Sequence, residues 1–496
     1  MGAAANPYER GLQLSARGRH LAAIEQYEKA LAGNPKDTKV LFALGNTARA
    51  LGMAAPAEQF FRQVLAIEPQ RLEALVNLAN LLRAGGQFDA AIALLEPALA
   101  RAPDSAELNL TLGSAWREKG DIAQAIGYTR AALAARPDYA PALSNLADLL
   151  CDEGARGEAL TLYDRAIKAE PKNAQARLNR AVLHLLDGEL KQGWRDYDSR
   201  LDMPGKFPAA QLKLTAWTGG PLKKTRLLVR AEQGVGDQMM FASLIPELAV
   251  RAAREGGSVV LECEPRLVPL FARSFPDVTV RPAVIKSVEG APVADHGWLK
   301  AAGGANAVIA MGSLPRYLRG STENFPLPHK FLTPDLEDVA LWKTILGPGA
   351  IGICWRSGQT GGHRAVQYAP LDAWGAFLCG LPGTIVCAQY DASREEIAKL
   401  EQMSGRRIIV PQGIDQKREL DRTCAMLSAL DCVVSAPTAV SWLAAGAGVK
   451  TLKILYDTSW TALGQAHEPF APSCTCVMPQ ARGDWASAFA KTRKLI

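Results

Sequence analysis

The segment PDYAPALSNLADLLCDEGARGEALTLYDRAIKAEP, residues 137–171, decides the fold of the first part of this chain, because a proline stands at each end of a 34-residue unit. The same spacing recurs at Pro35, Pro69, Pro103, Pro137 and Pro171. A proline is tolerated just after a helix, where its missing N–H costs nothing. The period therefore predicts a repeated helix pair that ends at each proline.

Three further positions keep this period. A small residue recurs in the first helix of each unit, at Gly11, Gly45, Ala79, Gly113, Ala147 and Ala181. Another opens the second helix, at Ala23, Ala57, Ala91, Ala125, Ala159 and Gly193. A large residue follows four positions later, at Tyr27, Phe61, Leu95, Tyr163 and Tyr197, with Thr129 as the exception. Small residues let paired helices approach, and we expect the large ones to fill the gap between them.

These positions resemble the tetratricopeptide repeat, a 34-residue helix-turn-helix unit that stacks into a superhelix. Residues 4–203 hold five good repeats and a degenerate sixth with no proline at its expected end, which predicts a capped array. Asn77, Asn145 and Asn179 share one position of the first helix. We expect them to face inward and bind the backbone of an extended acceptor peptide. This series is incomplete, since Ala43 and Thr111 hold the same position in other repeats.

The composition indicates a globular chain. Of 496 residues 48% are hydrophobic and 21% charged, which excludes a disordered protein. The net charge of +6 is too small to imply nucleic-acid binding. Nine cysteines, most of them in apolar stretches, suit a reducing compartment, and the pair Cys474 and Cys476 lacks a second metal-binding pair. With neither a signal peptide nor an 18-residue apolar run, we expect a cytoplasmic protein without a membrane span.

After the repeats the pattern changes to short apolar strands alternating with helices. Residues 204–225 are rich in Pro, Gly and Lys and read as a connector. We expect strands at 226–231, 258–263, 278–281 and 307–311 in one half, residues 226–335, with a helix over 239–254. A second half, residues 336–496, has expected strands at 350–355, 384–389, 407–410, 431–435 and 451–455. Strands alternating with helices predict two parallel, Rossmann-like α/β halves that face each other in a GT-B-type arrangement. Ligands would then bind beyond the carboxyl ends of the strands.

Glycines and a carboxylate follow the first strand of the first half, in the sequence QGVGDQ, residues 233–238. Gly234 and Gly236 would let a ligand approach the backbone, and the N-terminus of the following helix favours anions. Gln238 belongs to the same segment. Asp237 is either a helix-capping carboxylate or a general base at the floor of the cleft.

The first strand of the second half leads into Arg356, Ser357 and Gly358, and the glycine-rich loop continues to Arg364. Two arginines on such a loop suit a diphosphate or phosphodiester, although a solvated surface loop is the alternative. His363 in this loop reads as a surface residue. Gln389 at a strand end is a candidate nucleotide contact, as are Asp415 and Asp421.

The strand at 431–435 leads into Pro437, Thr438 and Ala439 and then a helix rich in Ala and Gly. A proline at the helix start and free N–H groups beside a hydroxyl predict a phosphate site, and a simply capped buried helix is the alternative. Three strand ends with anion-binding chemistry, expected at one cleft, favour the functional interpretation.

These motifs, over residues 225–470, resemble glycosyltransferases of the heptosyltransferase type. In that family the aspartate of G-x-G-D acts as base on the acceptor hydroxyl, a role that Asp237 would take. Basic residues after the W-x-x-G strand contact the donor phosphates, and Arg356 and then Arg364 match them. The late motif departs from the family, with Pro437 in place of its Asp and Trp442 in place of its His.

Repeats joined to such a domain are similar to bacterial flagellin glycosyltransferases, in which the array recognises the protein acceptor. That resemblance implies transfer of a sugar from a nucleotide donor to Ser or Thr, with CMP-linked nonulosonic acids (pseudaminic or legionaminic acid) favoured over UDP-linked sugars. We expect no metal site and no cofactor, because residues 204–496 contain no DxD triplet of the sort that holds a divalent metal on a nucleotide sugar. A homo-oligomer remains open. The alternatives are a repeat scaffold with an inactive transferase domain and a transferase that acts on a lipid or polysaccharide.

Overall fold

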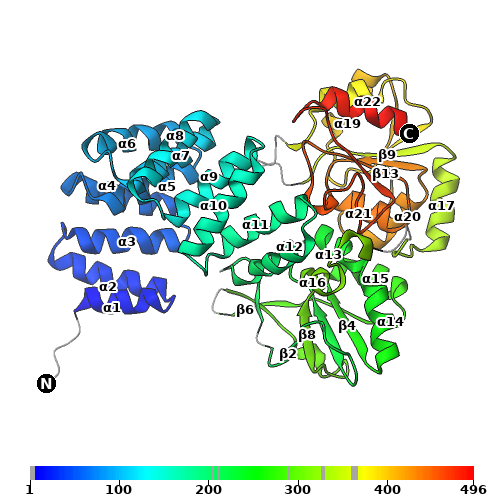
Figure 1. The fold of residues 1–496 in the computed structure, drawn as a ribbon, viewed down its shortest axis with the longest axis horizontal. Helices are drawn as coiled ribbons and strands as arrows, with labels where there is room; N and C mark the ends of the chain where they lie inside the picture. The colour runs from blue at the N-terminus through cyan, green and yellow to red at the C-terminus, as the bar shows by residue number, and fades with distance from the viewer. Residues whose placement is uncertain (1–5, 204, 211, 289–290, 326–329, 359–366) are drawn as a thin grey trace. The chain divides into compact units, whose positions relative to one another are not determined.

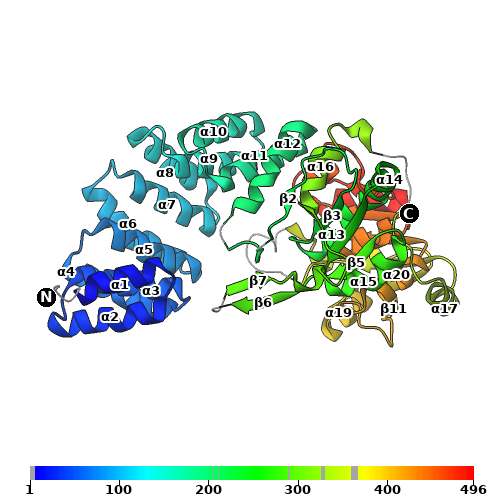
Figure 2. The same ribbon diagram turned by 90° about the horizontal axis from the view of Figure 1, so that it is seen from below.

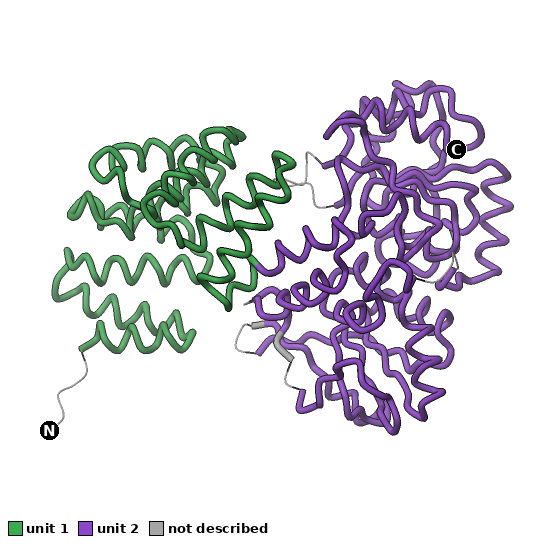
Figure 3. The backbone as a smooth tube through the Cα atoms, viewed as in Figure 1, with its two compact units in different colours: residues 1–176 green, residues 177–496 purple. Residues whose placement is uncertain are grey.

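The computed structural model describes residues 6–203, 205–210, 212–288, 291–325, 330–358 and 367–496. The chain forms two compact units, residues 1–176 and 177–496 (Figure 3). The first unit is helical, and the second contains every described strand (Figure 1). Each unit is described below by itself.

Ten helices make up the first unit in five antiparallel pairs. The first helices of the pairs are α1 (Pro7–Ala16), α3 (Thr38–Ala50), α5 (Leu72–Ala84), α7 (Ala106–Lys119) and α9 (Ala140–Asp152). The second helices are α2 (His20–Gly33), α4 (Ala54–Ile67), α6 (Phe88–Arg101), α8 (Ile122–Ala135) and α10 (Arg156–Ala169). Each periodic proline lies two residues beyond the second helix of its pair. The predicted repeat array is confirmed.

The small and large repeat positions meet inside each pair. A Cβ atom built on Gly45 would lie 2.7 Å from the Phe61 ring, and one built on Gly113 would lie 2.7 Å from the Thr129 hydroxyl. Gly11 faces the Tyr27 ring in the same way. A side chain at these positions would push the two helices apart, which explains the period of the small residues.

The turn inside each helix pair holds a glycine that also repeats every 34 residues. These glycines have positive φ angles of 73° to 97° and are Gly18, Gly52, Gly86, Gly120, Gly154 and Gly188. L-residues rarely adopt this left-handed conformation, so glycine is favoured there. The series reaches the sixth unit, which the proline period does not.

The sixth helix pair belongs mostly to the second unit and does not end the array as the predicted cap. It consists of α11 (Ala174–Leu186) and α12 (Leu190–Tyr197), followed by the 3-10 helix η1 (Asp198–Asp202). The buried side chains of Leu185, Trp194 and Tyr197 pack in one apolar cluster with Phe241 and Phe470 of the α/β part. A cap would instead turn a polar face to solvent.

The first α/β half contains a parallel five-stranded sheet in the order β2-β8-β3-β4-β5. Its strands are β2 (Thr215–Ala216), β3 (Arg226–Arg230), β4 (Ser258–Cys263), β5 (Thr279–Pro282) and β8 (Ala307–Ala310). The helices between them are α13 (Val235–Ala242), α14 (Ile245–Glu255) and α15 (Val268–Ser274). The single helix predicted over 239–254 is therefore two helices, since the chain turns at Ser243 and Leu244.

The second half contains a parallel six-stranded sheet in the order β11-β10-β9-β12-β13-β14. Its strands are β9 (Ala350–Cys354), β10 (Thr384–Cys387), β11 (Ile408–Ile409), β12 (Cys432–Ser435), β13 (Thr451–Ile454) and β14 (Cys474–Val477). Its helices are α17 (Leu336–Leu346), α18 (Leu371–Leu378), α19 (Arg394–Ser404), α20 (Leu420–Ser428), α21 (Ala439–Gly446) and α22 (Trp485–Leu495). This is the Rossmann strand order 3-2-1-4-5-6, and the parallel sheets with helices in both halves confirm the predicted α/β fold.

The sequence patterns did not indicate a small third sheet, which projects from the first half (Figure 2). In it β6 (Ile285–Val288) pairs antiparallel with β7 (Ala291–Ala294), and β1 (Ala209–Ala210) from the connector joins β7. The connector also supplies β2 to the five-stranded sheet. Among the described residues, no helix has both the length and the apolar character to cross a membrane.

Candidate functional site

A cavity of about 820 Å³ lies where loops from both α/β halves meet. It is lined by residues that follow β3 in the first half and β9, β10 and β12 in the second. In the second half β9 and β12 flank the point where the strand order reverses, and open α/β sheets bind ligands beside that point. The volume falls in the range of small-molecule and cofactor sites.

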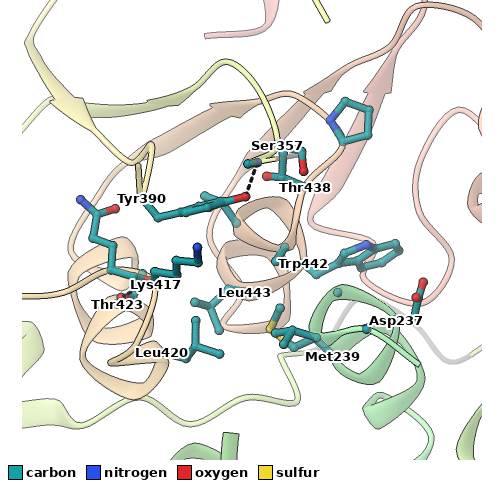
Figure 4. Close-up of a pocket in the computed structure, with 18 of the residues that line it drawn as sticks. Asp237, Met239, Ser357, Tyr390, Lys417, Leu420, Thr423, Thr438, Trp442 and Leu443 are labelled. Atoms are coloured by element: carbon teal, nitrogen blue, oxygen red, sulfur yellow. Dashed lines mark hydrogen bonds between the residues drawn. The ribbon is translucent and has the colours of Figure 1, made fainter. Parts of the chain in front are cut away.

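The loop after β3 brings Gly234, Gly236 and Asp237 to the cavity, as predicted. Gly234 is the N-cap of α13, and Asp237 is the third residue of that helix, so it does not cap it. A Cβ atom on Gly236 would lie 3.7 Å from Cδ1 of Trp442, so this loop sits close against α21. Figure 4 shows the Asp237 carboxylate beside the Trp442 indole.

The N-terminal end of α21 forms the opposite wall with Pro437, Thr438 and Ala439. Thr438 is the N-cap, and its side chain caps no backbone N–H of the helix. Its Oγ1 instead lies 3.2 Å from Oγ of Ser435 and 3.5 Å from Sγ of Cys354. Pro437 precedes the N-cap and does not occupy the first helical turn that we predicted. The first N–H groups of α21 thus lack a side-chain cap at the cavity wall, as anion binding requires.

Arg356 does not line the cavity, in contrast to the expected phosphate contact. Its guanidinium forms a fork with Glu396, with Nε and Nη2 each 2.8 Å from a carboxylate oxygen, and Nη1 lies 2.9 Å from Oδ1 of Asp391. Hydrogen bonds to Glu396 and Asp391 raise the pKa of Arg356. Both carboxylates compensate its charge, so the arginine fixes the loop after β9 rather than facing a ligand.

Gln389 is also structural, being 2% exposed and absent from the cavity wall. Its Oε1 accepts hydrogen bonds of 3.0 Å from the backbone N–H groups of Trp355 and Arg356. Its Nε2 donates to Asp391 at 2.6 Å. The residue therefore holds the end of β9 against β10.

Ser357 and Gly358 do line the cavity. The Gly358 N–H donates to the Tyr390 hydroxyl at 2.5 Å, which is drawn as a dashed line in Figure 4. Arg364 and His363 lie outside the described residues. Of the predicted loop, only the part next to β9 can therefore be placed.

Two cations of the cavity wall escaped the sequence analysis, Arg266 and Lys417. Arg266 comes from the first half, donates to both oxygens of Glu264 and reaches the carbonyl oxygen of Lys417 in the second half at 2.7 Å. Figure 4 shows the Lys417 amine directed into the cavity. Neither residue belongs to a glycine-rich motif, and only the meeting of the two halves brings them together.

Aromatic side chains add apolar wall to the cavity, namely Tyr368, Tyr390, Trp442 and Trp460. Behind Trp442, the buried Nζ of Lys453 lies 4.2 Å from the centroid of the indole and forms an ion pair of 2.5 Å with Glu468. A cation over an aromatic face is attracted by the ring. The Trp442 indole is therefore held in place from the side that faces away from the cavity.

Gln238 lies beside the cavity but lines a smaller one of about 200 Å³ with Arg230, Glu262 and Glu264. Its Nε2 donates to the Gln233 carbonyl at 2.7 Å, and its Oε1 accepts from the Glu264 N–H at 2.8 Å. Its role is to join the loop after β3 to the loop after β4. Asp415 and Asp421 do not line the larger cavity, and Asp421 holds Arg273 through two bonds of 2.6 and 2.7 Å.

The three array asparagines are half-buried, and two of them link neighbouring repeats. Nδ2 of Asn77 donates to Oδ1 of Asn46 at 2.9 Å, and Nδ2 of Asn145 donates to Oγ of Ser114 at 3.2 Å. Asn179 occupies the same position in α11. An amide has four hydrogen-bonding sites, so these bonds leave capacity for a peptide. No group of three or more His, Cys, Asp or Glu suited to a metal ion occurs among the described residues.

The repeat region matches a known family. Residues 8–71, 76–140 and 144–194 match the tetratricopeptide repeat model, so the N-terminal part of the chain consists of these repeats. This chain is also similar to Protein FlbA of Caulobacter vibrioides, with 34% identity over 304 residues. That alignment covers 60% of this chain and 51% of the relative, so the match spans about half the relative's length.

Two solved repeat proteins are similar to part of this chain. TTC0263, a thermophilic tetratricopeptide repeat protein in Thermus thermophilus, is 31% identical over 36% of this chain and 98% of its own, with a TM-score of 0.33. YrrB, described as a repeat protein with an unusual peptide-binding site, is 21% identical over 35% of this chain and 90% of its own, with a TM-score of 0.28.

Proposed function

We propose that this protein is a glycosyltransferase that moves a sugar from a nucleotide donor to a Ser or Thr hydroxyl of a protein. The observation that carries the proposal is the single cavity that unites the Asp237 loop of one Rossmann-like half with the α21 N-terminus of the other. The Asp237 carboxylate can serve the acceptor, and the N–H groups of the α21 N-terminus can bind a phosphate on the opposite wall of the same cavity. That pairing is what glycosyl transfer from a phosphate leaving group requires.

In the proposed reaction the acceptor oxygen attacks the anomeric carbon of the donor sugar. Asp237 takes the proton of the acceptor hydroxyl as the new C–O bond forms. The bond between the anomeric carbon and the phosphate oxygen breaks, and the nucleotide leaves with the electron pair. The α21 N-terminus stabilises the negative charge that develops on that phosphate.

We assign the cationic contribution to Lys417 and Arg266, in place of Arg356. Lys417 presents its amine to the cavity. The Arg356 guanidinium, in contrast, forms ion pairs with Glu396 and Asp391. The wall aromatics suit a nucleobase or a sugar ring. A CMP-linked nonulosonic acid remains our preferred donor over a UDP-linked sugar, on the family resemblance alone.

For the acceptor we propose a polypeptide bound by the repeat array, with flagellin as the candidate and the cytoplasm as the compartment. Repeat superhelices present extended concave surfaces to partners. The half-buried Asn77 and Asn145 on the first helices are suited to a peptide backbone. No cofactor or metal enters the proposal, and self-association stays open.

A scaffold without transferase activity is the second candidate. It is favoured by the two replacements Pro437 and Trp442, both in the cavity wall. Under that proposal the repeats bind partners and the α/β part has no turnover. Transfer to a lipid or polysaccharide is a third candidate, which the peptide-binding repeats disfavour.

The test combines nucleotide binding with one conservative substitution. The unfolding temperature should be measured with CMP, UDP, GDP and ADP in turn. It should rise with the nucleotide of the donor, because a ligand at 100 times its Kd stabilises the folded protein by about 2.7 kcal/mol. Asp237→Asn should keep that shift and lower sugar transfer to the acceptor protein about 10²- to 10⁴-fold. The matched control Asp277→Asn, an exposed carboxylate of the same half, should change neither. No shift with any nucleotide and no transfer by the wild type would support the scaffold instead.

A further inference from the structure

The loop that carries Asp237 is held by residues from the end of the sixth repeat. Residues 232–234 connect β3 to α13, and both Glu232 and Gln233 bond to side chains of the segment 197–200. All of these residues belong to the second unit. A repeat unit and a candidate catalytic loop therefore share one hydrogen-bonded network.

Tyr197, the last residue of α12, forms the first of these contacts. Its hydroxyl donates to Oε1 of Gln233 at 3.0 Å. Its ring centroid lies 5.6 Å from that of Trp194 and 5.4 Å from that of Trp460, so packing fixes the ring on both sides. Burial raises the pKa of Tyr197, and the charges of Asp237 and Glu232 add to this rise. The hydroxyl therefore stays protonated and remains a donor across the physiological pH range.

Arg200 forms the second contact, through a buried ion pair with Glu232. Nη2 and Nε of Arg200 lie 2.7 and 3.2 Å from Oε1 of Glu232. The Glu232 carboxylate also accepts the backbone N–H groups of Met311 and Gly312, each at 3.1 Å. Hydrogen bonds to this one carboxylate, which follows β3, therefore connect Arg200 at the end of the sixth repeat with the backbone that follows β8.

We propose that Tyr197 and Arg200 are positioning residues, which set the loop 232–234 and through it the place of Asp237 in the cavity. This inference rests on the proposed transferase function for its catalytic consequence. Its structural part does not, because the loop is held whether or not the protein transfers a sugar. Asp237 lies four residues after the last contact, Gln233, within the first turn of α13, so a shift of the loop moves the carboxylate with it.

Two side chains near the end of the repeats interact electrostatically with Asp237, namely Tyr197 and Lys206. Burial, together with the Arg200 charge, lowers the pKa of Lys206. The end of the repeat array therefore contributes to the electrostatic surroundings of the proposed base.

The test uses two tyrosines at the same repeat position. Tyr197→Phe removes the bond to Gln233 and keeps the ring. The control Tyr163→Phe lies 34 residues earlier, where a buried tyrosine hydroxyl bonds to Asp148 instead. Hydrogen–deuterium exchange of the full chain should be about 5-fold faster for amides of residues 232–238 in Tyr197→Phe, and unchanged there in Tyr163→Phe. Equal exchange of this segment in Tyr197→Phe and in the wild type would overturn the proposal.

Activity supplies a second measurement. In Tyr197→Phe, kcat should fall about 5- to 10-fold while the thermal shift with the nucleotide stays as in the wild type, and Arg200→Lys should behave alike. A Tyr163→Phe variant that loses as much kcat would overturn the positioning role, because a general loss of stability would then explain both. If the wild type transfers no sugar, the proposed function fails, whereas the exchange result still decides whether this segment holds the loop.

Discussion

We predict that the stable minimum of the second unit begins inside the repeat array, before α11, and not at its end. The comparison is between a chain that starts at residue 172 and one that starts at residue 204. The longer fragment keeps α11, α12 and η1, which are part of the second unit except for the first residues of α11. The shorter one keeps only the α/β sheets.

The structure gives the size of the difference. Residues 172–203 contribute Trp194, which is 1% exposed, and removal of a buried tryptophan side chain costs about 3–5 kcal/mol. Loss of Arg200 leaves the buried Glu232 charge unpaired, which costs about 3–5 kcal/mol more. The sum of about 6–10 kcal/mol, before Leu185 and Tyr197 are counted, reaches the whole net stability of a typical domain.

Thermal unfolding by circular dichroism and size-exclusion chromatography would measure the outcome. We expect cooperative unfolding of the fragment 172–496 and aggregation or no cooperative transition for 204–496. Equal transitions within a few degrees would refute the reasoning, since the sixth repeat would then add nothing to the α/β core. The result also decides which truncation is a fair test of the array in acceptor recognition.

Three further predictions follow from single positions. Gly45→Ala should destabilise the array by about 1–3 kcal/mol, because the new methyl group would meet the Phe61 ring. Gly127→Ala should instead stabilise its helix by up to about 1 kcal/mol, because Gly127 has open space around it. Thermal unfolding of the two variants separates these outcomes. Cys379 is the exposed thiol, Cys151 is half-buried with a pKa that burial raises to about 11, and the other seven cysteines are buried, so a thiol reagent at pH 8 should label Cys379 fastest in the native protein, and equally rapid labelling of a buried site would contradict the burial. Lys417→Ala should weaken nucleotide binding about 10- to 100-fold by isothermal calorimetry, and unchanged affinity would remove this amine from the phosphate site.

The repeat array was accessible to sequence analysis because its signals are local. Each proline ends its own helix, and each small residue faces a partner within the same helix pair, so a fixed period reveals both. The end of the array was not accessible in this way. The sixth unit keeps the turn glycine Gly188 but lacks the proline, and only the buried contacts of Trp194 show that it joins the α/β core.

The same distinction applies to the cavity. The loops at Gly234 and Thr438 were predicted because a strand followed by glycines or a helix start is visible in one stretch of sequence. Arg356 sits in an equally suitable stretch, yet Glu396, 40 residues later, binds its guanidinium. Lys417 stands in no motif and reaches the cavity only through the tertiary fold. The strands β6 and β7 have four residues each, and Pro292 stands inside β7, so their sequence resembles a loop.

The repeated turn glycine has a consequence for the length of the repeat array. Because every unit closes with the same left-handed turn and ends at the same proline, whole units of 34 residues could be inserted or removed among the first five without altering the sixth. Each insertion would lengthen the array by one constant step. The number of units would therefore set the length of the helical array, while the contacts of the sixth unit within the α/β core stay the same.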